Sequence, residues 1–149
     1  MTAVLLDTGP LGLASNPKAS PETEACTVWL LTLLQQGVAV YIPEIADYEV
    51  RRELIRGGKT RGLARLNELK TTLRYLPLST EVMLRAADYW AFARQQGTPT
   101  ATDAALDGDV ILAAQADGLR RYGVESLIAT TNVKHLSRFV PAKFWQDIT

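Results

Sequence analysis

The sequence predicts an α/β protein built on a central parallel sheet. Short apolar runs that favour strands alternate along the chain with longer stretches whose apolar residues recur at helical spacing. Strands that are separated by helices pair in parallel through right-handed crossovers. The length of 149 residues is typical of one domain, and no internal repeat or linker divides it. A single domain over residues 1–149 is therefore predicted.

The strand candidates are short apolar runs bounded by turn residues. The main ones cover residues 4–6, 38–42 and 126–130, and weaker ones cover residues 73–76 and an edge strand within residues 139–148. The first run ends at Asp7-Thr8-Gly9-Pro10, a cluster that predicts a turn followed by a polar loop.

The helix candidates have recognisable ends. Ser20, Pro21 and Glu22 provide an N-cap, a proline at the first helical position and an acid in the first turn, which predicts a helix ending at Gly37. Further helices are predicted from Pro43 to Gly57, over residues 61–72, from Ser79 or Thr80 to Gly97, and over residues 110–119. The composition of residues 98–107 predicts a loop.

The composition excludes several classes of protein. Hydrophobic residues make up 47% of the chain and charged residues 21%, a mixture that rules out a disordered or fibrous protein. A single cysteine, Cys26, excludes an intramolecular disulfide, and a single histidine, His135, excludes motifs that need two. No apolar run approaches the roughly 18 residues of a membrane span, and no signal peptide is visible, so a cytoplasmic protein without membrane attachment is expected.

Acidic and amide side chains fall where ligands bind in parallel sheets, at the carboxyl ends of the strands. Asp7 directly follows the first strand, Asn132 follows the strand over residues 126–130, and Glu49 lies on the inward side of the helix after the second strand. Asp107 and Asp109 precede the helix over residues 110–119, where ordinary capping is the alternative interpretation. Carboxylates that converge on one crevice suit Mg²⁺ or Mn²⁺, which can activate water and neutralise charge on a phosphodiester.

Four segments of the chain resemble, in order, the four signature segments of the PIN domain. They are residues 4–9 (VLLDTG), 45–54 (IADYEVRREL), 109–114 (DVILAA) and 129–136 (ATTNVKHL). In particular, they are similar to the segments of VapC-type toxins of bacterial toxin–antitoxin pairs. The resemblance runs from Asp7 to Phe139 and implies a three-layer α/β/α fold with a central parallel sheet.

The resemblance also implies an activity, a metal-dependent endoribonuclease that cleaves single-stranded or structured RNA. Carried over residue by residue, Asp7, Glu49 and Asp109 would hold Mg²⁺ or Mn²⁺. Asn132 stands at a fourth catalytic position that is often acidic in the family, and an amide there can orient water but adds no charge. Thr8 matches the hydroxyl residue that often follows the first acid.

Two further acids and two kinds of partner complete what the resemblance implies. Asp107 or Asp103 would supply the charge that Asn132 lacks. A small antitoxin that inserts a segment near the acidic cleft is expected as a partner, and so is a second copy of the chain in a homodimer.

Basic residues are concentrated in one stretch although the net charge of the chain is zero. Eight of the sixteen lysines and arginines fall between Arg51 and Arg74. A basic block next to Glu49 can position a phosphate backbone, so Arg51, Arg52 and Arg56 are the predicted RNA contacts. The alternative is a pair of solvated helices with no partner.

Two other functions remain open from the sequence. One is a non-catalytic PIN-like module that binds RNA or a protein, with its site weakened by Asn132. The other is a structural α/β domain whose acids only cap helices. Metal-dependent cleavage of RNA would separate the nuclease from both.

Overall fold

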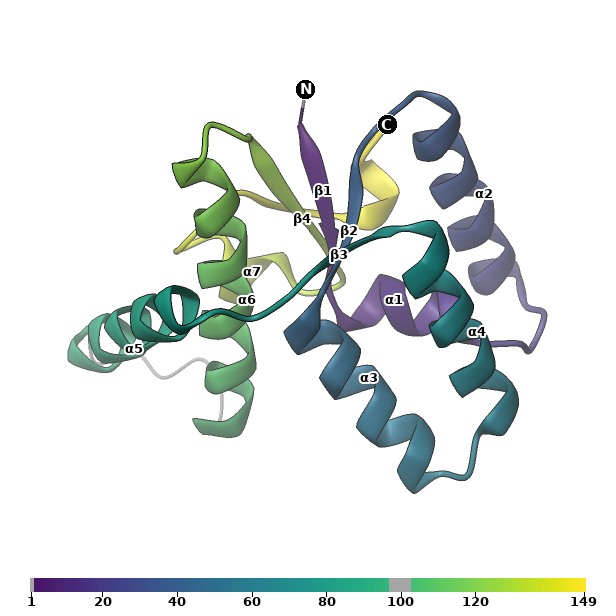
Figure 1. Cartoon of the computed structure of the whole chain (residues 1–149), viewed down its shortest axis with the longest axis horizontal. Helices are drawn as coiled ribbons and strands as arrows, with labels where there is room; N and C mark the ends of the chain where they lie inside the picture. Colours follow the sequence, from purple (N-terminus) through teal and green to yellow (C-terminus); the bar gives the residue numbers. More distant parts are fainter. Residues whose placement is uncertain (1, 97–102) are drawn as a thin grey trace.

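The computed structural model describes residues 2–96 and 103–149 and contains a five-stranded parallel sheet. The strands are β1 (Ala3–Leu6), β2 (Val40–Pro43), β3 (Arg74–Leu76), β4 (Ser126–Thr130) and β5 (Ala142–Phe144). They lie in the order β3-β2-β1-β4-β5, and all four pairings are parallel. The predicted parallel sheet is confirmed, including the edge strand near the end of the chain (Figure 1).

Helices cover both faces of the sheet. They are α1 (Thr8–Ser15), α2 (Pro21–Gln35), α3 (Glu44–Arg56), α4 (Thr60–Thr72), α5 (Thr80–Gln95), α6 (Asp103–Arg121) and α7 (Val133–Leu136), with a 3-10 turn at η1 (Trp145–Asp147). Figure 1 shows α1, α2 and α4 on one side of the sheet and α5 and α6 on the other. None of the helices within residues 2–96 and 103–149 combines the length and the apolar character needed to cross a lipid bilayer.

Apolar cores on both faces of the sheet hold these layers together. Along β1, side chains alternate between the faces of the sheet, as the strand geometry requires. Leu6 is buried in the core that contains Leu30 of α2, whereas Leu5 is buried in the core that contains Leu112 of α6. The three-layer α/β/α fold is therefore confirmed.

The segment after β1 is a helix and not the predicted turn and loop. Asp7 has extended backbone angles and its side chain accepts a hydrogen bond from the backbone N–H of Thr8, so it acts as the N-cap of α1. Pro10 lies in the first turn of α1, where a proline does not remove an intrahelical hydrogen bond. The residues that predicted a turn are therefore the start signal of a helix.

Helix α6 begins earlier than predicted. Residues 103–107 were expected in a loop, but they form the first turns of a helix that starts at Asp103. Buried Leu106, Val110 and Ala114 pack on α5, and this tertiary contact extends the helix beyond what the local composition predicts. Residues 98–102 of the predicted loop lie outside the described residues.

Candidate metal centre

Asp7 is held rigidly at the carboxyl edge of the sheet. One carboxylate oxygen, Oδ1, accepts a hydrogen bond from the backbone N–H of Thr8 at 2.7 Å, and the Thr8 hydroxyl lies 3.5 Å from the same oxygen. The other oxygen, Oδ2, accepts a hydrogen bond from the Thr130 hydroxyl at 2.8 Å. Thr130 is fully buried at the end of β4, the strand beside β1. These donors fix the orientation of the Asp7 carboxylate.

Sequence reasoning did not single out Thr130, although a signal was present. It is the last residue of a predicted strand, and parallel pairing places Leu6 opposite Ala129. Asp7 directly follows Leu6, and Thr130 directly follows Ala129. The strand register therefore predicts that the Thr130 hydroxyl lies next to the Asp7 carboxylate.

Glu49 approaches from α3 and lies directly against α6. A Cβ atom built on Gly108 would be 2.7 Å from Glu49 Oε2, so the carboxylate occupies the space beside the glycine backbone. Burial raises the pKa of the Glu49 carboxyl, and the negative charge of Asp7 raises it further. Arg52, whose Nη2 lies 3.9 Å from Oε2, lowers this pKa, while Asp109 adds to the increase.

Asp109 lies in the second turn of α6 and completes a group of three acids. Burial and the negative charge of Asp7 raise the pKa of the Asp109 carboxyl to about 6, against the lowering effect of His135 and Arg138. His135 Nδ1 lies 3.5 Å from Asp109 Oδ2. Because α6 begins at Asp103, the capping interpretation of Asp107 and Asp109 is wrong.

The three carboxylates therefore act on one another electrostatically, although they come from segments far apart in the sequence. Asp7 raises the pKa of both Glu49 and Asp109, after the effect of burial. Oxygen ligands of this kind suit a hard divalent cation, whose positive charge relieves repulsion among carboxylates. Within the described residues, however, no group of three or more His, Cys, Asp or Glu side chains already surrounds a position for a metal ion. The donor chemistry suits Mg²⁺ or Mn²⁺, but the three acids do not form a preassembled metal site.

Asn132 is linked to the third acid through His135. Its backbone N–H donates to the Thr130 hydroxyl at 2.9 Å, and its side-chain Nδ2 is 3.2 Å from His135 Nδ1. The side chain makes no capping hydrogen bond to α7, although Asn132 is the residue before that helix. His135 thus connects the predicted fourth position to Asp109 at the edge of the acidic group.

The two additional acids are placed differently. Asp107 is two positions from Asp109 on α6, and residues at that spacing do not share a helix face. It lines a separate hollow with Met83 and Trp90 of α5, away from Glu49. Asp103 is the first residue of α6, and its side chain lies outside the described residues.

Comparisons with known proteins give a structural likeness only. No family model matches the sequence, and no curated protein matches it either. A chain of VapBC2 from Rickettsia felis, solved bound to a DNA fragment from their promoter, has a TM-score of 0.72 and 16% sequence identity, over 97% of this chain and 99% of that chain. The chain has a PIN-like fold.

Two more solved structures share this PIN-like fold. A chain of VapBC-1 from nontypeable Haemophilus influenzae has a TM-score of 0.67 and 16% identity, over 98% of this chain and 100% of that chain. A chain of DNA-bound VapBC from Salmonella typhimurium has a TM-score of 0.65 and 21% identity, over 97% of this chain and 99% of that chain. The fold is thus shared over nearly the full length of each chain, while the sequences have diverged widely.

The three arginines that were predicted to contact RNA have different surroundings in the PIN-like fold. The Arg51 guanidinium is bound to buried Asp47, with both Nε and Nη2 at 3.0 Å from Oδ1, and it donates to Asn67 at 2.9 Å. Arg52 is 53% exposed beside Glu49, and Arg56 is exposed and paired with Glu53. Arg52 is therefore the one of these three that lies next to the acids.

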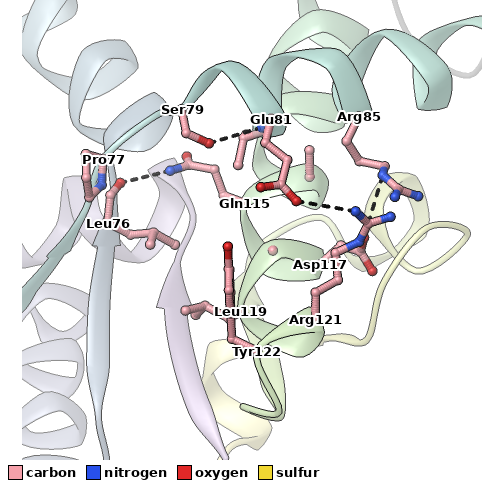
Figure 2. Close-up of a pocket in the computed structure, with 13 residues that line it drawn as sticks. Leu76, Pro77, Ser79, Glu81, Arg85, Gln115, Asp117, Leu119, Arg121 and Tyr122 are labelled. Carbon is pink, nitrogen blue, oxygen red and sulfur yellow. Dashed lines mark hydrogen bonds and ion pairs between the residues drawn. The ribbon is translucent and has the colours of Figure 1, made fainter.

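A buried glutamine braces the two helices that carry Glu49 and Asp109. Gln115 of α6 donates from Nε2 to the carbonyl oxygen of Leu76 at 2.8 Å (Figure 2). Its Oε1 accepts from the backbone N–H of Ile45 at 3.3 Å. It also lines a hollow of about 310 Å³ between β3, the start of α5 and α6. That hollow is separate from the acidic group, because none of the three acids lines it.

Proposed function

We propose that this protein is a Mg²⁺- or Mn²⁺-dependent endoribonuclease that cleaves single-stranded or structured RNA, and that it is the toxin of a toxin–antitoxin pair. The observation that supports the proposal is that the charge of Asp7 acts on both Glu49 and Asp109, in a fold shared with VapBC chains. A structural domain whose acids only cap helices would not bring three of them together at a cost in repulsion.

The three acids would hold the ion, and each is suited to a different part of that task. Asp7 is oriented in advance by Thr8 and Thr130, which leaves its carboxylate with little freedom to lose on binding. Glu49 and Asp109 are half-buried acids with raised pKa values. A bound cation would stabilise their ionised forms, which burial and the neighbouring negative charge disfavour. When bound, such an ion lowers the pKa of a water molecule and neutralises charge on a phosphodiester.

Cations on both sides of the acidic group would bind the RNA backbone. Arg52 lies beside Glu49 on α3, and Arg138 lies close enough to Asp109 for its charge to act on that carboxyl. The guanidinium of Arg52 also lies over the ring of Tyr48, 5.1 Å from its centre, which restrains the side chain near Glu49. Phosphates on either side of the cleaved bond would contact these two arginines. Asn132 would orient a water molecule through its amide oxygen.

The test is cleavage of a labelled single-stranded RNA by the purified protein. We expect cleavage with Mn²⁺ or Mg²⁺ that stops when EDTA is added and returns with excess metal. Asp7→Asn keeps the shape of the side chain but removes its charge, so it should abolish cleavage, whereas Asp88→Asn on the exposed side of α5 should not. Full cleavage by Asp7→Asn would contradict the proposed site.

A second function, a non-catalytic PIN-like module that binds RNA or a protein, is favoured by one observation. The fourth position carries Asn132 and not an acid, which leaves the group with less negative charge for a metal. RNA binding without cleavage in any divalent metal would support that module over the nuclease.

A further inference from the structure

A glycine inside helix α6 faces the carboxylate of Glu49. The three heavy atoms nearest to a Cβ built on Gly108 all belong to that carboxylate group, with Oε2 at 2.7 Å, Cδ at 3.2 Å and Oε1 at 3.3 Å. We propose that Gly108 is a positioning residue of the acidic site, because its missing side chain lets Glu49 reach the surface of α6 and face Asp7 and Asp109. The inference rests on the proposed function for its meaning in metal binding, but the contact itself can be tested without metal.

The helix gains nothing locally from this glycine. Glycine in a helix interior is less favourable than alanine, and α6 is otherwise rich in alanine and leucine. A packing requirement would appear as a close backbone or an apolar neighbour, as at Gly62, where a Cβ would meet Leu54 at 3.0 Å. At Gly108 the close neighbour is instead the end of a charged side chain from another helix.

The chain contains a matched control on the same helix. A Cβ on Gly118 would have Val82 as its nearest neighbour, at the ordinary contact distance of 3.7 Å. An alanine at that position therefore adds helix propensity without displacing a functional group. Any difference between substitutions at the two glycines reports on what lies opposite them.

A methyl group on Gly108 would move the Glu49 carboxylate and not the backbone, because a glutamate side chain is flexible. Arg52 is the alternative partner, since its Nη2 is already 3.9 Å from Oε2 and its side chain is largely exposed. We expect the displaced carboxylate to turn toward Arg52 and away from Asp7 and Asp109. The fold would tolerate the change, whereas the arrangement of the three acids would not.

The contact is tested first in the metal-free protein with a thermal double-mutant cycle. Gly118→Ala should raise the Tm by about 2–4 °C through helix propensity. Gly108→Ala should raise it less or lower it in the wild-type background, but raise it as much as Gly118→Ala does when Glu49→Ala removes the opposing side chain. The same rise in both backgrounds would overturn the proposal. If Gly108→Ala alone fails to fold, recovery of folding in the double variant supports the contact and continued failure refutes it.

The consequence for the site is tested by titration with Mn²⁺ alone. Gly108→Ala should weaken Mn²⁺ binding roughly tenfold or more, as changes behind a metal ligand commonly do, while Gly118→Ala should bind as the wild type does. Equal affinity of the two alanine variants would overturn the positioning role. If the wild-type protein itself binds no Mn²⁺, the proposed function fails, and the thermal cycle alone then decides whether Gly108 places Glu49.

Discussion

At the scale of single residues, the protein holds its three acids in two different ways. Asp7 accepts hydrogen bonds from the Thr8 backbone and the Thr130 hydroxyl, which fix the orientation of its carboxylate. Glu49 and Asp109 are instead half-buried among like charges, and their pKa values are raised. The metal-free site therefore carries an electrostatic cost in the latter two residues.

The raised pKa of Asp109 predicts that the stability of the protein depends on pH. Burial, then Asp7, raises the pKa of Asp109 to about 6, so the folded protein holds this proton more tightly than the unfolded chain. The contribution of protonated Asp109 to the free energy of unfolding is complete below the ordinary pKa of aspartate. It is lost as the pH rises through about 6. The raised pKa corresponds to at most about 3 kcal/mol, and solvent screening at this partly exposed group reduces the figure to about 1–2 kcal/mol.

Asp109→Asn should accordingly stabilise the metal-free protein at pH 8 by about 1–2 kcal/mol and flatten the decline between pH 4 and pH 7. Urea unfolding across this pH range measures the effect, with Asp88→Asn as the control at an exposed aspartate. A variant whose unfolding free energy follows the wild-type curve at every pH would show that Asp109 carries no such cost.

Asn132→Asp tests whether the fourth position belongs to the site. In the metal-free protein, a fourth carboxylate near Asp109 should lower the Tm at pH 8 through repulsion. With Mn²⁺ present, added ligand charge should strengthen binding, and each tenfold gain in affinity adds about 1.4 kcal/mol, or roughly 3–6 °C, to the metal-induced shift. Differential scanning fluorimetry with and without Mn²⁺ measures both effects. Equal metal-induced shifts in the two proteins would place Asn132 outside the site.

At the scale of elements, one side of α3 is attached to the rest of the fold and another side carries Arg52 beside the acidic group. On the structural side, Asp47 is buried and bound by Arg51, by Lys70 of α4 at 3.7 Å, and by the Tyr75 hydroxyl, which donates at 2.7 Å. Burial, together with Asp47, raises the pKa of Tyr75 well above its usual range. This network attaches α3 to α4 and β3. On the other side, Arg52 lies beside the acidic group.

The two sides of α3 predict different effects of arginine substitution. Arg52→Gln with Arg56→Gln should weaken RNA binding and reduce the salt slope by about 0.7 for each lost phosphate contact to a single strand. Arg51→Gln should instead lower the free energy of unfolding by about 1–3 kcal/mol, because Asp47 loses a charged partner inside the protein. Filter binding across a salt series, together with urea unfolding, separates the two. An unchanged salt slope in the Arg52 and Arg56 variant would assign those charges to a solvated surface.

At the scale of the whole molecule, the fold brings segments that are far apart in the sequence to one edge of the sheet. Helices α3 and α6 lie at that edge, contact each other, and are braced by Gln115, which bonds Ile45 at the start of α3 and Leu76 at the end of β3. The acids of the site come from residues 7, 49 and 109, so no local unit of the chain contains the whole group. Only the complete sheet brings them together.

If the protein is a toxin, as proposed, it should harm the cell that makes it. We expect induced expression of the wild-type chain to arrest growth, Asp7→Asn to abolish the effect, and co-expression of a small antitoxin to restore growth. An antitoxin segment with a basic residue could pair with Asp7, Glu49 or Asp109 in place of the metal.

Light scattering should give twice the chain mass of 16.4 kDa if the homodimer forms. A monomer whose expression does not slow growth would contradict the proposed toxin function.

Local sequence patterns were enough to predict much of this architecture. Alternating strands and helices predicted the parallel sheet, because periodicity of apolar residues is a local property that reports which face is buried. The cap at Ser20 and the proline that follows it marked the start of α2 correctly for the same reason. Asp7 was identifiable because a carboxylate directly after a buried strand must lie at the edge of the sheet.

Other features depended on contacts between residues far apart in the chain, and only the tertiary structure decided them. Helix α6 extends to Asp103 because Leu106 packs on α5. The sequence by itself determined which acids and arginines are available, whereas the fold decided that Arg51 binds Asp47 and that Gly108 faces Glu49. Periodicity and capping act over a few residues, but the position of a side chain in a site depends on the neighbouring element, which local patterns do not specify.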